Sequence, residues 1–354
     1  MSDLFSHLSL RGVDFHNRIW VSPMCQYSAI DGVATQWHDV HIGSFATGGT
    51  GMIMMEATGV VPEGRISTAC LGLWNDKQAE RLRPIVDFAH SMGTIIGIQL
   101  AHAGRKGSCL PPWSDHPMAS KEEGGWECVA PSAISFGGKY PVPRALSIPE
   151  IRKLVVAFAQ SAQLAVKAGF DLVEIHAAHG YLIHQFLSPI SNQRSDVYGG
   201  SFENRTRFIL EIAKEVRTVI PDSMPLFVRI SASDWLEDGW TIDESVELCK
   251  LLKDVGVDLI DVSSGGTSSG APVPVGPGYQ VPFAERIRIE AKIPTCAVGL
   301  ITESKQAEEI IRSGKADAVM MAREFLRNPR WPLQAAKELN ADVKWPNQLL
   351  RGKG

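Results

Sequence analysis

The chain has 354 residues, of which 44% are hydrophobic and 21% are charged, and 35 basic against 39 acidic side chains give a net charge of −4. This composition is typical of a globular protein, and the length suits a single (β/α)8 barrel with insertions. Because no block of basic residues occurs, nucleic acids and anionic membranes are not expected as partners.

Cysteine usage and the lack of long apolar runs bear on the location of the protein. No Cys-x-x-Cys pair occurs among the six cysteines, which are Cys25, Cys70, Cys109, Cys128, Cys249 and Cys296. We therefore expect reduced thiols, with neither a disulfide framework nor a zinc ribbon. The first residues lack the basic charge and apolar run of a secretion signal, and no run reaches the ~18–20 residues of a membrane span. A cytoplasmic protein is the expectation.

Eight short apolar runs recur along the chain, and helical patterns separate them. The runs lie at residues 18–21, 52–55, 95–98, 172–175, 226–230, 259–262, 295–298 and 318–321. Ser147-x-x-Glu150 and Thr241-x-x-Glu244 are capping boxes that predict helix starts, and Thr302 is expected to open another helix. Strands that alternate with helices indicate parallel βα units. Eight such units predict one closed barrel domain spanning the whole chain; an open doubly wound sheet is the alternative, but no Gly-x-Gly-x-x-Gly turn follows a strand.

Three segments lie outside these units. Residues 8–15 predict a short hairpin that plugs the bottom of the barrel. Residues 101–146 are rich in Gly, Pro and Trp. A loop of this length in a compact domain is usually a functional lid or carries minor structure of its own, with structureless padding as the alternative. Residues 341–354 form a C-terminal tail.

His176-Ala-Ala-His179-Gly-Tyr181 follows the fourth run and supplies two imidazoles and a phenol within six positions. In (β/α)8 barrels the chemistry occurs at the carboxyl ends of the strands. From these residues alone a catalytic pair, a metal site and structural histidines are all possible. A metal would need a third ligand, for which Glu56 or His102 is the candidate.

Two features favour a phosphorylated cofactor. Gly299 and Arg323 follow the seventh and eighth runs, where such barrels often bind phosphate. The backbone at Gly299 can approach an anion, and Arg323 can bind phosphate oxygens in pairs. Arg229 ends the fifth run as a charge that needs a partner, such as an anionic or electron-rich ring. A structural ion pair is the alternative for each arginine.

Six motifs run in order along nearly the whole chain. They are Ser22-Pro-Met-Cys25-Gln-Tyr27, Glu56-Ala57, Gln99-Leu-Ala-His102-Ala-Gly104-Arg105, His176-Ala-Ala-His179-Gly-Tyr181, Ser191-Asn-x-Arg194-x-Asp196-x-Tyr198-Gly-Gly-Ser-x-Glu203-Asn-Arg205 and Arg323-x-Phe-Leu-x-Asn-Pro329. In combination they resemble the old yellow enzyme family of flavin-dependent ene reductases. Cys25 and the histidine pair are similar to the thermophilic-like bacterial branch that includes xenobiotic reductase.

The resemblance implies a non-covalent FMN that NADPH or NADH reduces. The residues implied to surround the isoalloxazine ring and ribityl chain are Ser22, Pro23, Met24, Cys25, Ala57, Gln99 and Arg229, and those at the phosphate are Ser264, Gly299, Ala322 and Arg323. Ala322 departs from the family, which usually has glycine there. An alanine still donates its backbone N–H, so we expect a modest effect unless this residue needs a positive φ. Cys25 would modulate the flavin potential, and a packed thiol is the alternative.

The resemblance also implies the reaction, which is reduction of the activated C=C bond of a small enone. His176 and His179 would hold the carbonyl oxygen while flavin N5 delivers hydride to the β-carbon, and Tyr181 would protonate the α-carbon. Tyr27 would contact the substrate. No metal takes part in this reaction.

The tail resembles a family segment whose arginine, here Arg351, reaches into the neighbouring subunit's pocket. We therefore expect a homodimer or homotetramer. Leu349 and Leu350 replace the usual aromatic and acidic residues before this arginine, so a solvated tail is the alternative. Other functions also stay open: reduction of xenobiotics, quinones or nitro compounds at the same flavin, a flavin-binding redox sensor at Cys25, and a metal-dependent barrel lyase.

Overall fold

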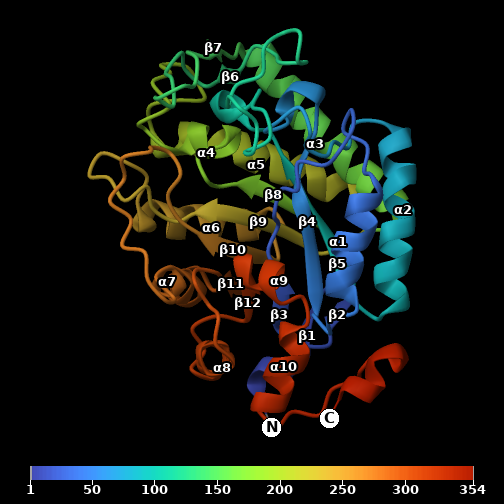
Figure 1. The fold of residues 1–354 in the computed structure, drawn as a ribbon. Helices are drawn as coiled ribbons and strands as arrows, with labels where there is room; N and C mark the ends of the chain where they lie inside the picture. Colours follow the sequence, from blue (N-terminus) through green and yellow to red (C-terminus); the bar gives the residue numbers. More distant parts are fainter. Residues whose placement is uncertain (1, 354) are drawn as a thin grey trace.

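The computed structural model describes residues 2–353, and a closed barrel of parallel strands forms its centre. The barrel strands are Ile19–Val21 (β3), Met52–Gly59 (β4), Ile95–Ala101 (β5), Leu172–Ala177 (β8), Leu226–Ser231 (β9), Leu259–Ser263 (β10), Thr295–Ala297 (β11) and Ala318–Met321 (β12). They follow one another around the barrel in chain order, and β12 closes the barrel by pairing with β3. Each strand matches one of the eight apolar runs, so the predicted (β/α)8 barrel is confirmed (Figure 1).

Helices surround the barrel. They are Gln36–Ala46 (α1), Asp76–Ser91 (α2), Ile148–Ala168 (α3), Leu182–Leu187 (α4), Phe202–Val219 (α5), Ile242–Asp254 (α6), Val281–Ala291 (α7), Ser304–Arg312 (α8), Arg323–Arg327 (α9) and Trp331–Glu338 (α10), with short 3-10 turns at Asp3–Phe5 (η1), Pro62–Gly64 (η2), Gly104–Lys106 (η3) and Asn347–Gly352 (η4). None of the described helices combines the length and apolar character that a membrane crossing requires.

The ends of the helices agree closely with the sequence signals. Both predicted capping boxes form, at the start of α3 and at the start of α6. The helix predicted to open at Thr302 begins instead at Ser304, after Glu303 at the N-cap. Thr302 uses its backbone N–H to bind the side chain of Gln306, so it lies just before the first turn. A difference of one or two residues is ordinary at a helix end.

The predicted N-terminal hairpin is present and plugs the bottom of the barrel. Its strands are Leu8–Leu10 (β1) and Val13–Phe15 (β2), which pair antiparallel. Phe15 is fully buried, and its ring lies 4.8 Å from that of Trp20 and 6.4 Å from that of Phe227. These aromatic rings fill the space between the first halves of the strands, which leaves the other end of the barrel for a site.

The long segment after β5 has structure of its own, as the sequence predicts. It contains η3 and the two short paired strands Val129–Ala130 (β6) and Arg144–Ala145 (β7). This segment lies at the end of the molecule that is opposite to the two chain termini (Figure 1). The bottom plug and this covering segment therefore occupy opposite ends of the barrel.

Candidate active site

Polar side chains from neighbouring strands meet inside the upper half of the barrel. The strand register places Gln99 beside Glu174, His176 beside Arg229, and Arg229 beside Asp261. All five side chains are buried. Because burying charged and polar groups is unfavourable unless they are paired, this cluster marks the region where the barrel departs from ordinary core packing.

Several strands, among them β4 and β8, run further than the apolar runs predict. β4 continues to Gly59, so Glu56 and Ala57 lie within the strand rather than after it, and β8 continues to Ala177, so His176 also lies within its strand. The pairing between β4 and β5 shifts register between Met55 and Ala57. Such a bulge re-aims the side chain at the irregular position, here Glu56. The apolar runs predict that these polar residues follow the strands, whereas they lie in the last residues of the strands.

His176, His179 and Tyr181 form the predicted cluster. The ring of His176 lies 5.2 Å from that of His179 and 5.1 Å from that of Tyr181. Burial lowers the pKa of both imidazoles well below the usual value, with a smaller effect from the charge of Arg229. Burial also raises the pKa of the Tyr181 phenol well above its usual range. At neutral pH the cluster therefore holds two neutral imidazoles and a protonated phenol.

The two imidazoles differ in their hydrogen bonds. Nδ1 of His176 is buried and has no hydrogen-bond partner among the described residues, whereas Nε2 of His179 lies 2.7 Å from the hydroxyl oxygen of Ser263. A buried nitrogen without a partner is uncommon in a folded protein. A bound molecule could therefore provide the hydrogen-bond partner that Nδ1 of His176 lacks.

The turn that carries this cluster is held by left-handed backbone and by close packing. His179 has φ +60° and Gly180 has φ +70°. A side chain on Gly180 would collide with the carbonyl oxygen of Gly266 in the loop after β10. The N–H of Gly180 donates to Nδ1 of His184 over 2.9 Å, and Nε2 of His184 lies 3.1 Å from Asp234. The turn therefore has a fixed place between two loops and a buried histidine that contacts Asp234.

Lys106, for which the sequence motifs predict no role, also supports the cluster. Its ammonium group donates to the carbonyl oxygens of His179 and Gly266 over 2.8 and 3.1 Å. It also lies 5.0 Å from the centre of the Tyr181 ring. Burial lowers the pKa of Lys106 to about 8. Its position directly after the Gly104-Arg105 pair of a strand-end motif is the sequence signal that could have identified it.

Arg229 has a protein partner. Its Nε lies 3.0 Å from Oδ2 of Asp261, which is the ion pair considered as the alternative. The interpretation that only a bound ring would satisfy the charge of Arg229 is therefore wrong. Glu174 lies in the same buried cluster and accepts a hydrogen bond of 2.7 Å from the Gln99 side chain. Burial, and then the charge of Asp261, raise the pKa of Glu174 to about 8. One arginine thus faces two buried carboxyl groups, of which Glu174 is protonated at neutral pH.

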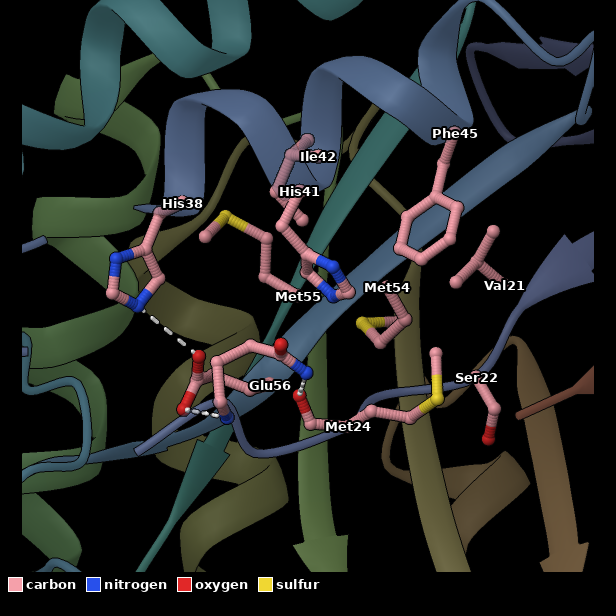
Figure 2. A pocket seen from close by; sticks show the side chains of 11 residues that line it. Val21, Ser22, Met24, His38, His41, Ile42, Phe45, Met54, Met55 and Glu56 are labelled. Atoms are coloured by element: carbon pink, nitrogen blue, oxygen red, sulfur yellow. Dashed lines mark hydrogen bonds and ion pairs between the residues drawn. The ribbon is translucent and has the colours of Figure 1, made fainter. Parts of the chain in front are cut away.

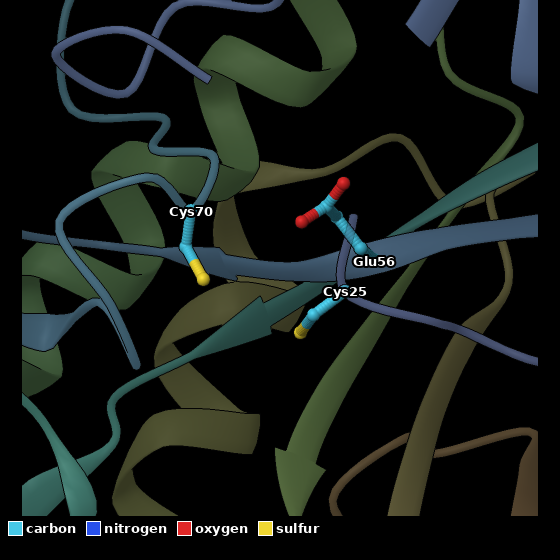
Figure 3. A group of neighbouring side chains, drawn as sticks. All are labelled: Cys25, Glu56 and Cys70. Atoms are coloured by element: carbon cyan, nitrogen blue, oxygen red, sulfur yellow. The ribbon is translucent and has the colours of Figure 1, made fainter. Parts of the chain in front are cut away.

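Cys25, Glu56 and Cys70 form a second group, with Glu56 in β4 and the two cysteines in the loops after β3 and β4 (Figure 3). Their two sulfur atoms and a carboxylate oxygen lie within 4.8 Å of one another. The Glu56 carboxylate already lies 3.3 Å from Nε2 of His38 and accepts the N–H of Gln26 over 3.2 Å (Figure 2). Between residues 2 and 353 no other set of three potential metal ligands is as close, so the histidine pair lacks the third ligand that a metal site needs.

Ser22 and Met24 lie beside this group. Together with Glu56 and two histidines of α1 they line a small cavity of about 10 Å³ (Figure 2). A cavity of that size holds about one water molecule, so it is no ligand site in itself. Burial lowers the pKa of His41, which lines it, to about 4.

The loops after β11 and β12 supply the residues predicted to bind phosphate. Gly299 has φ +127°, and a side chain there would lie 3.0 Å from the Gln280 amide and 3.1 Å from the Tyr279 ring. Arg323 is exposed and has no ion pair or side-chain hydrogen bond within the described part of the chain. The pKa of Tyr279 is raised by burial and lowered in part by the charge of Arg323, which places this arginine near the same ring. Gly299 and the unpaired guanidinium of Arg323 thus both lie near Tyr279.

Ala322 departs from the family pattern without strain from a positive φ. Its φ is −107°, which an alanine can adopt, and its carbonyl oxygen accepts the N–H of Leu326. The expectation that alanine is tolerated at this position therefore agrees with the backbone. On the neighbouring loop, the Ser264 hydroxyl donates to Gln280 over 2.7 Å.

The polar groups and the exposed Arg323 lie at the carboxyl ends of the strands, where (β/α)8 barrels have their active sites and often bind phosphate groups. Comparison with known proteins specifies the class of protein. Residues 3–342 match the model of the NADH:flavin oxidoreductase / NADH oxidase family. The chain is 51% identical over 351 residues to the NADPH dehydrogenase of Geobacillus thermodenitrificans, covering 99% of this chain and 98% of that protein.

Solved structures agree with this assignment. Morphinone reductase superposes with a TM-score of 0.80 at 28% identity, covering 98% of this chain and 92% of the other. The old yellow enzyme homologue of Zymomonas mobilis has a TM-score of 0.78 at 29% identity, covering 97% and 94%. The chain belongs to the NADH:flavin oxidoreductase / NADH oxidase family, and the predicted resemblance to old yellow enzymes is confirmed. It is an oxidoreductase with FMN as cofactor and a reduced nicotinamide as reductant.

Proposed function

We propose that the protein is an ene reductase, which uses NADPH to reduce the activated C=C bond of α,β-unsaturated carbonyl compounds. The observation that carries this proposal is the cluster of two neutral imidazoles and a protonated phenol, with ring distances of 5.2 and 5.1 Å. When bound, FMN supplies the hydride. The preference for NADPH is supported by the name of the relative that is 51% identical.

His176 and His179 bind the carbonyl oxygen of the substrate. Negative charge develops on this oxygen as hydride reaches the β-carbon, and preorganised N–H donors stabilise such charge. Nδ1 of His176 has no described protein partner, which suits a hydrogen bond to a bound molecule. Because burial and Arg229 keep both rings neutral, each ring carries one N–H without bringing a second positive charge into the pocket.

Tyr181 acts as the general acid that protonates the α-carbon. Burial raises its pKa, so the phenol carries its proton at neutral pH. As the proton leaves, the Lys106 ammonium group at 5.0 Å from the ring stabilises the phenolate that forms. A positioned acid of this kind contributes typically about 10²–10⁴-fold to a rate.

The cofactor site extends across the barrel mouth from β3 to β12. The residues that would hold the flavin ring and ribityl chain are Ser22, Pro23, Met24, Cys25, Ala57, Gln99 and Arg229, and those that would hold the phosphate are Ser264, Gly299, Ala322 and Arg323. Support for the phosphate end comes from the unpaired guanidinium of Arg323 and the open backbone at Gly299. Support for the ring end comes from Arg229, whose charge lies beside His176.

Residues 101–146 serve as the lid of this site. The ring of Trp113, on this segment, packs edge-on against Tyr27 with 5.8 Å between ring centres. Trp113 is 70% exposed, so the contact with Tyr27 covers little of its ring in a single chain. Tyr27 has φ +50°, a backbone conformation that residues other than glycine rarely adopt. Its proposed role is to contact the substrate under the lid.

The tail makes the active site a shared one. Arg351 lies in the exposed η4 segment, and the residues before it line a cavity with His7 and His16 at the bottom of the barrel. The tail thus lies far from the mouth of its own barrel (Figure 1). An arginine that completes a pocket in a homodimer or homotetramer therefore comes from a neighbouring subunit.

Turnover of a simple enone tests the proposal. Holoprotein supplied with NADPH and 2-cyclohexenone is expected to form cyclohexanone, with one NADPH consumed per product, while quinones and nitro compounds turn over more slowly. Rapid reduction of the flavin by NADPH, followed by electron transfer to quinones or dioxygen but not to the enone, would contradict it. That outcome would mean that the protein is a flavin oxidoreductase whose electron acceptor is not an enone.

A further inference from the structure

Cys25 and Cys70 lie next to each other although 44 residues separate them in the chain. Cys25 lies in the loop after β3, and Cys70 lies in the loop after β4 (Figure 3). The N–H of Ala29 donates to the carbonyl oxygen of Ala69 over 2.9 Å, which joins the two loops close to both cysteines. Their sulfur atoms lie within 4.8 Å of each other. The two thiols therefore form a pair that the fold holds together.

The two members of the pair have different surroundings. Cys25 is partly exposed, whereas Cys70 is fully buried with its sulfur 3.3 Å from the hydroxyl oxygen of Ser67. The hydrogen bond between the two thiols lowers the pKa of Cys70 and, together with burial, raises the pKa of Cys25, so Cys70 is the more acidic thiol of the pair. Cys25 is thus the thiol that a dissolved oxidant can reach, and Cys70 is the neighbouring thiol that can attack an oxidised Cys25 sulfur.

We propose that Cys25 and Cys70 are a modification site, where a hydroperoxide converts the two thiols into a reversible disulfide. In the first step the Cys25 sulfur attacks one peroxide oxygen, the O–O bond breaks, and Cys25 sulfenic acid and water form when hydrogen peroxide is the oxidant. In the second step the Cys70 sulfur attacks the Cys25 sulfur, the S–O bond breaks, and a second water leaves. Two thiols and one hydrogen peroxide thus give one disulfide and two water molecules.

The remaining cysteines do not compete for this reaction. Sγ of Cys109 and Sγ of Cys128 both lie against the carbonyl oxygen of Gly107, at 3.7 and 3.3 Å. Cys249 and Cys296 are fully buried in α6 and β11. The carboxylate of Glu56 is engaged by His38 and Gln26, so it does not turn the pair into a complete metal site. Cys70 is therefore the partner that the structure offers to an oxidised Cys25.

The protein can meet the oxidant at its own site, because reduced flavin passes electrons to dioxygen and hydrogen peroxide results. The family that the chain belongs to includes NADH oxidases. Hydrogen peroxide added directly would act in the same way, so this arm of the test is independent of the proposed enone reduction.

Peptide mapping of the FMN-loaded protein tests the proposal. Trypsin places Cys25 in residues 19–65, Cys70 in residues 66–77, Cys109 in residues 107–121 and Cys128 in residues 122–139, so each cysteine is distinguishable. After hydrogen peroxide, or after NADPH and dioxygen without an organic acceptor, the thiols are alkylated in denaturant and the peptides are analysed by mass spectrometry. We expect a disulfide joining residues 19–65 to 66–77, the loss of two alkylated thiols, and full return of both after dithiothreitol.

Two variants test whether Cys70 is the partner of Cys25. In Cys70→Ser, Cys25 is expected to proceed to sulfinic acid, whereas the matched Cys128→Ser variant should form the disulfide as the wild type does. Cys25 that becomes sulfinic acid in the wild type as fast as in Cys70→Ser would overturn the proposal. So would a disulfide between Cys25 and Cys109 or Cys128. The wild-type map decides the matter even if Cys70→Ser folds poorly.

Discussion

The pKa values of a few side chains decide which of them are neutral and which carry a proton at the mouth of the barrel. Burial keeps His176 and His179 neutral and keeps Tyr181 protonated. The same burial leaves Lys106 with a pKa of about 8. Three uncharged hydrogen-bond donors thus converge on one small region, which suits an uncharged carbonyl substrate.

Replacing Tyr181 by Phe separates the two halves of the reaction. The variant retains the ring but loses the acidic proton, so protonation of the α-carbon should slow by about 10²-fold or more. Reduction of the flavin by NADPH does not use this proton and should keep its rate. Anaerobic stopped-flow spectroscopy measures both steps, and equal slowing of both would show that Tyr181 serves a different purpose.

Glu174 should make the stability of the protein fall as pH rises. The native state holds its proton up to about pH 8, whereas an unperturbed glutamate releases it near 4.5. Between these values the native state binds more protons than the unfolded chain, so the free energy of unfolding decreases with increasing pH. Glu174→Gln removes this contribution, and urea unfolding at two pH values inside the range should show a shallower slope. Identical slopes for the variant and the wild type would contradict a protonated Glu174.

At the scale of elements, the loops after β8 and β10 set the geometry of the site. They approach so closely that each has a glycine where the other passes, at Gly180 and Gly266. The lysine of η3 then binds a carbonyl oxygen of each loop. The position of the imidazoles therefore depends on a contact between two loops as well as on the strand that carries His176.

A pair of glycine substitutions tests this contact. Gly180 has φ +70° and faces Gly266, whereas Gly200 has φ +80° and no heavy atom near the place of a new side chain. Gly200→Ala should cost about 1–2 kcal/mol of stability from backbone strain and leave turnover unchanged. Gly180→Ala should cost more and should also raise KM for the enone, because the turn with His179 must move. Thermal unfolding and steady-state kinetics give the comparison, and matching losses in the two variants would mean that the loop contact is unimportant.

The elements whose causes are local could be predicted from the sequence. Apolar runs located the strands, and the boxes at Ser147 and Thr241 located two helix starts. The partners of Arg229 could not be predicted in this way. Asp261 lies in an apolar run that gives no sign of an ion pair, and the register of two neighbouring strands creates that pair.

The same limit applies to contacts between loops. Cys25 and Cys70 meet because β3 and β4 are neighbours and their loops are hydrogen-bonded, which neither local sequence reveals. Lys106 reaches Gly266 from 160 residues away. The motifs identified which strand ends carry the site, but the neighbours that tune each residue follow from the closed barrel.

In the whole molecule, the residues that stabilise the fold and the residues of the site lie at opposite ends of the barrel. The hairpin lies at one end of the barrel and the covering segment at the other (Figure 1). The aromatic cluster packs with the hairpin, and the polar cluster lies toward the carboxyl ends of the strands. In barrels of this kind the bottom face contributes mainly to stability and the top face to function.

Phe15→Ala tests that separation. Phe15 is fully buried against Trp20, so its loss should lower the free energy of unfolding by about 3–5 kcal/mol. The flavin spectrum and the KM for the enone should stay as in the wild type at a temperature where the variant is folded. Denaturant unfolding and steady-state kinetics provide the two readouts, and a changed flavin environment would show that the two ends are coupled.

Titration with a para-substituted phenol tests most directly whether His176 and His179 hold the oxygen atom of a bound molecule. A phenolate in this position imitates the substrate oxygen and produces a long-wavelength charge-transfer band with oxidised FMN. The band should form with wild-type holoprotein and with the control His90→Ala, whose histidine pairs with Asp171 on the outside of the barrel. It should be absent from His176→Ala at equal flavin content. A band of undiminished strength in His176→Ala, or no band in the wild type, would contradict the account.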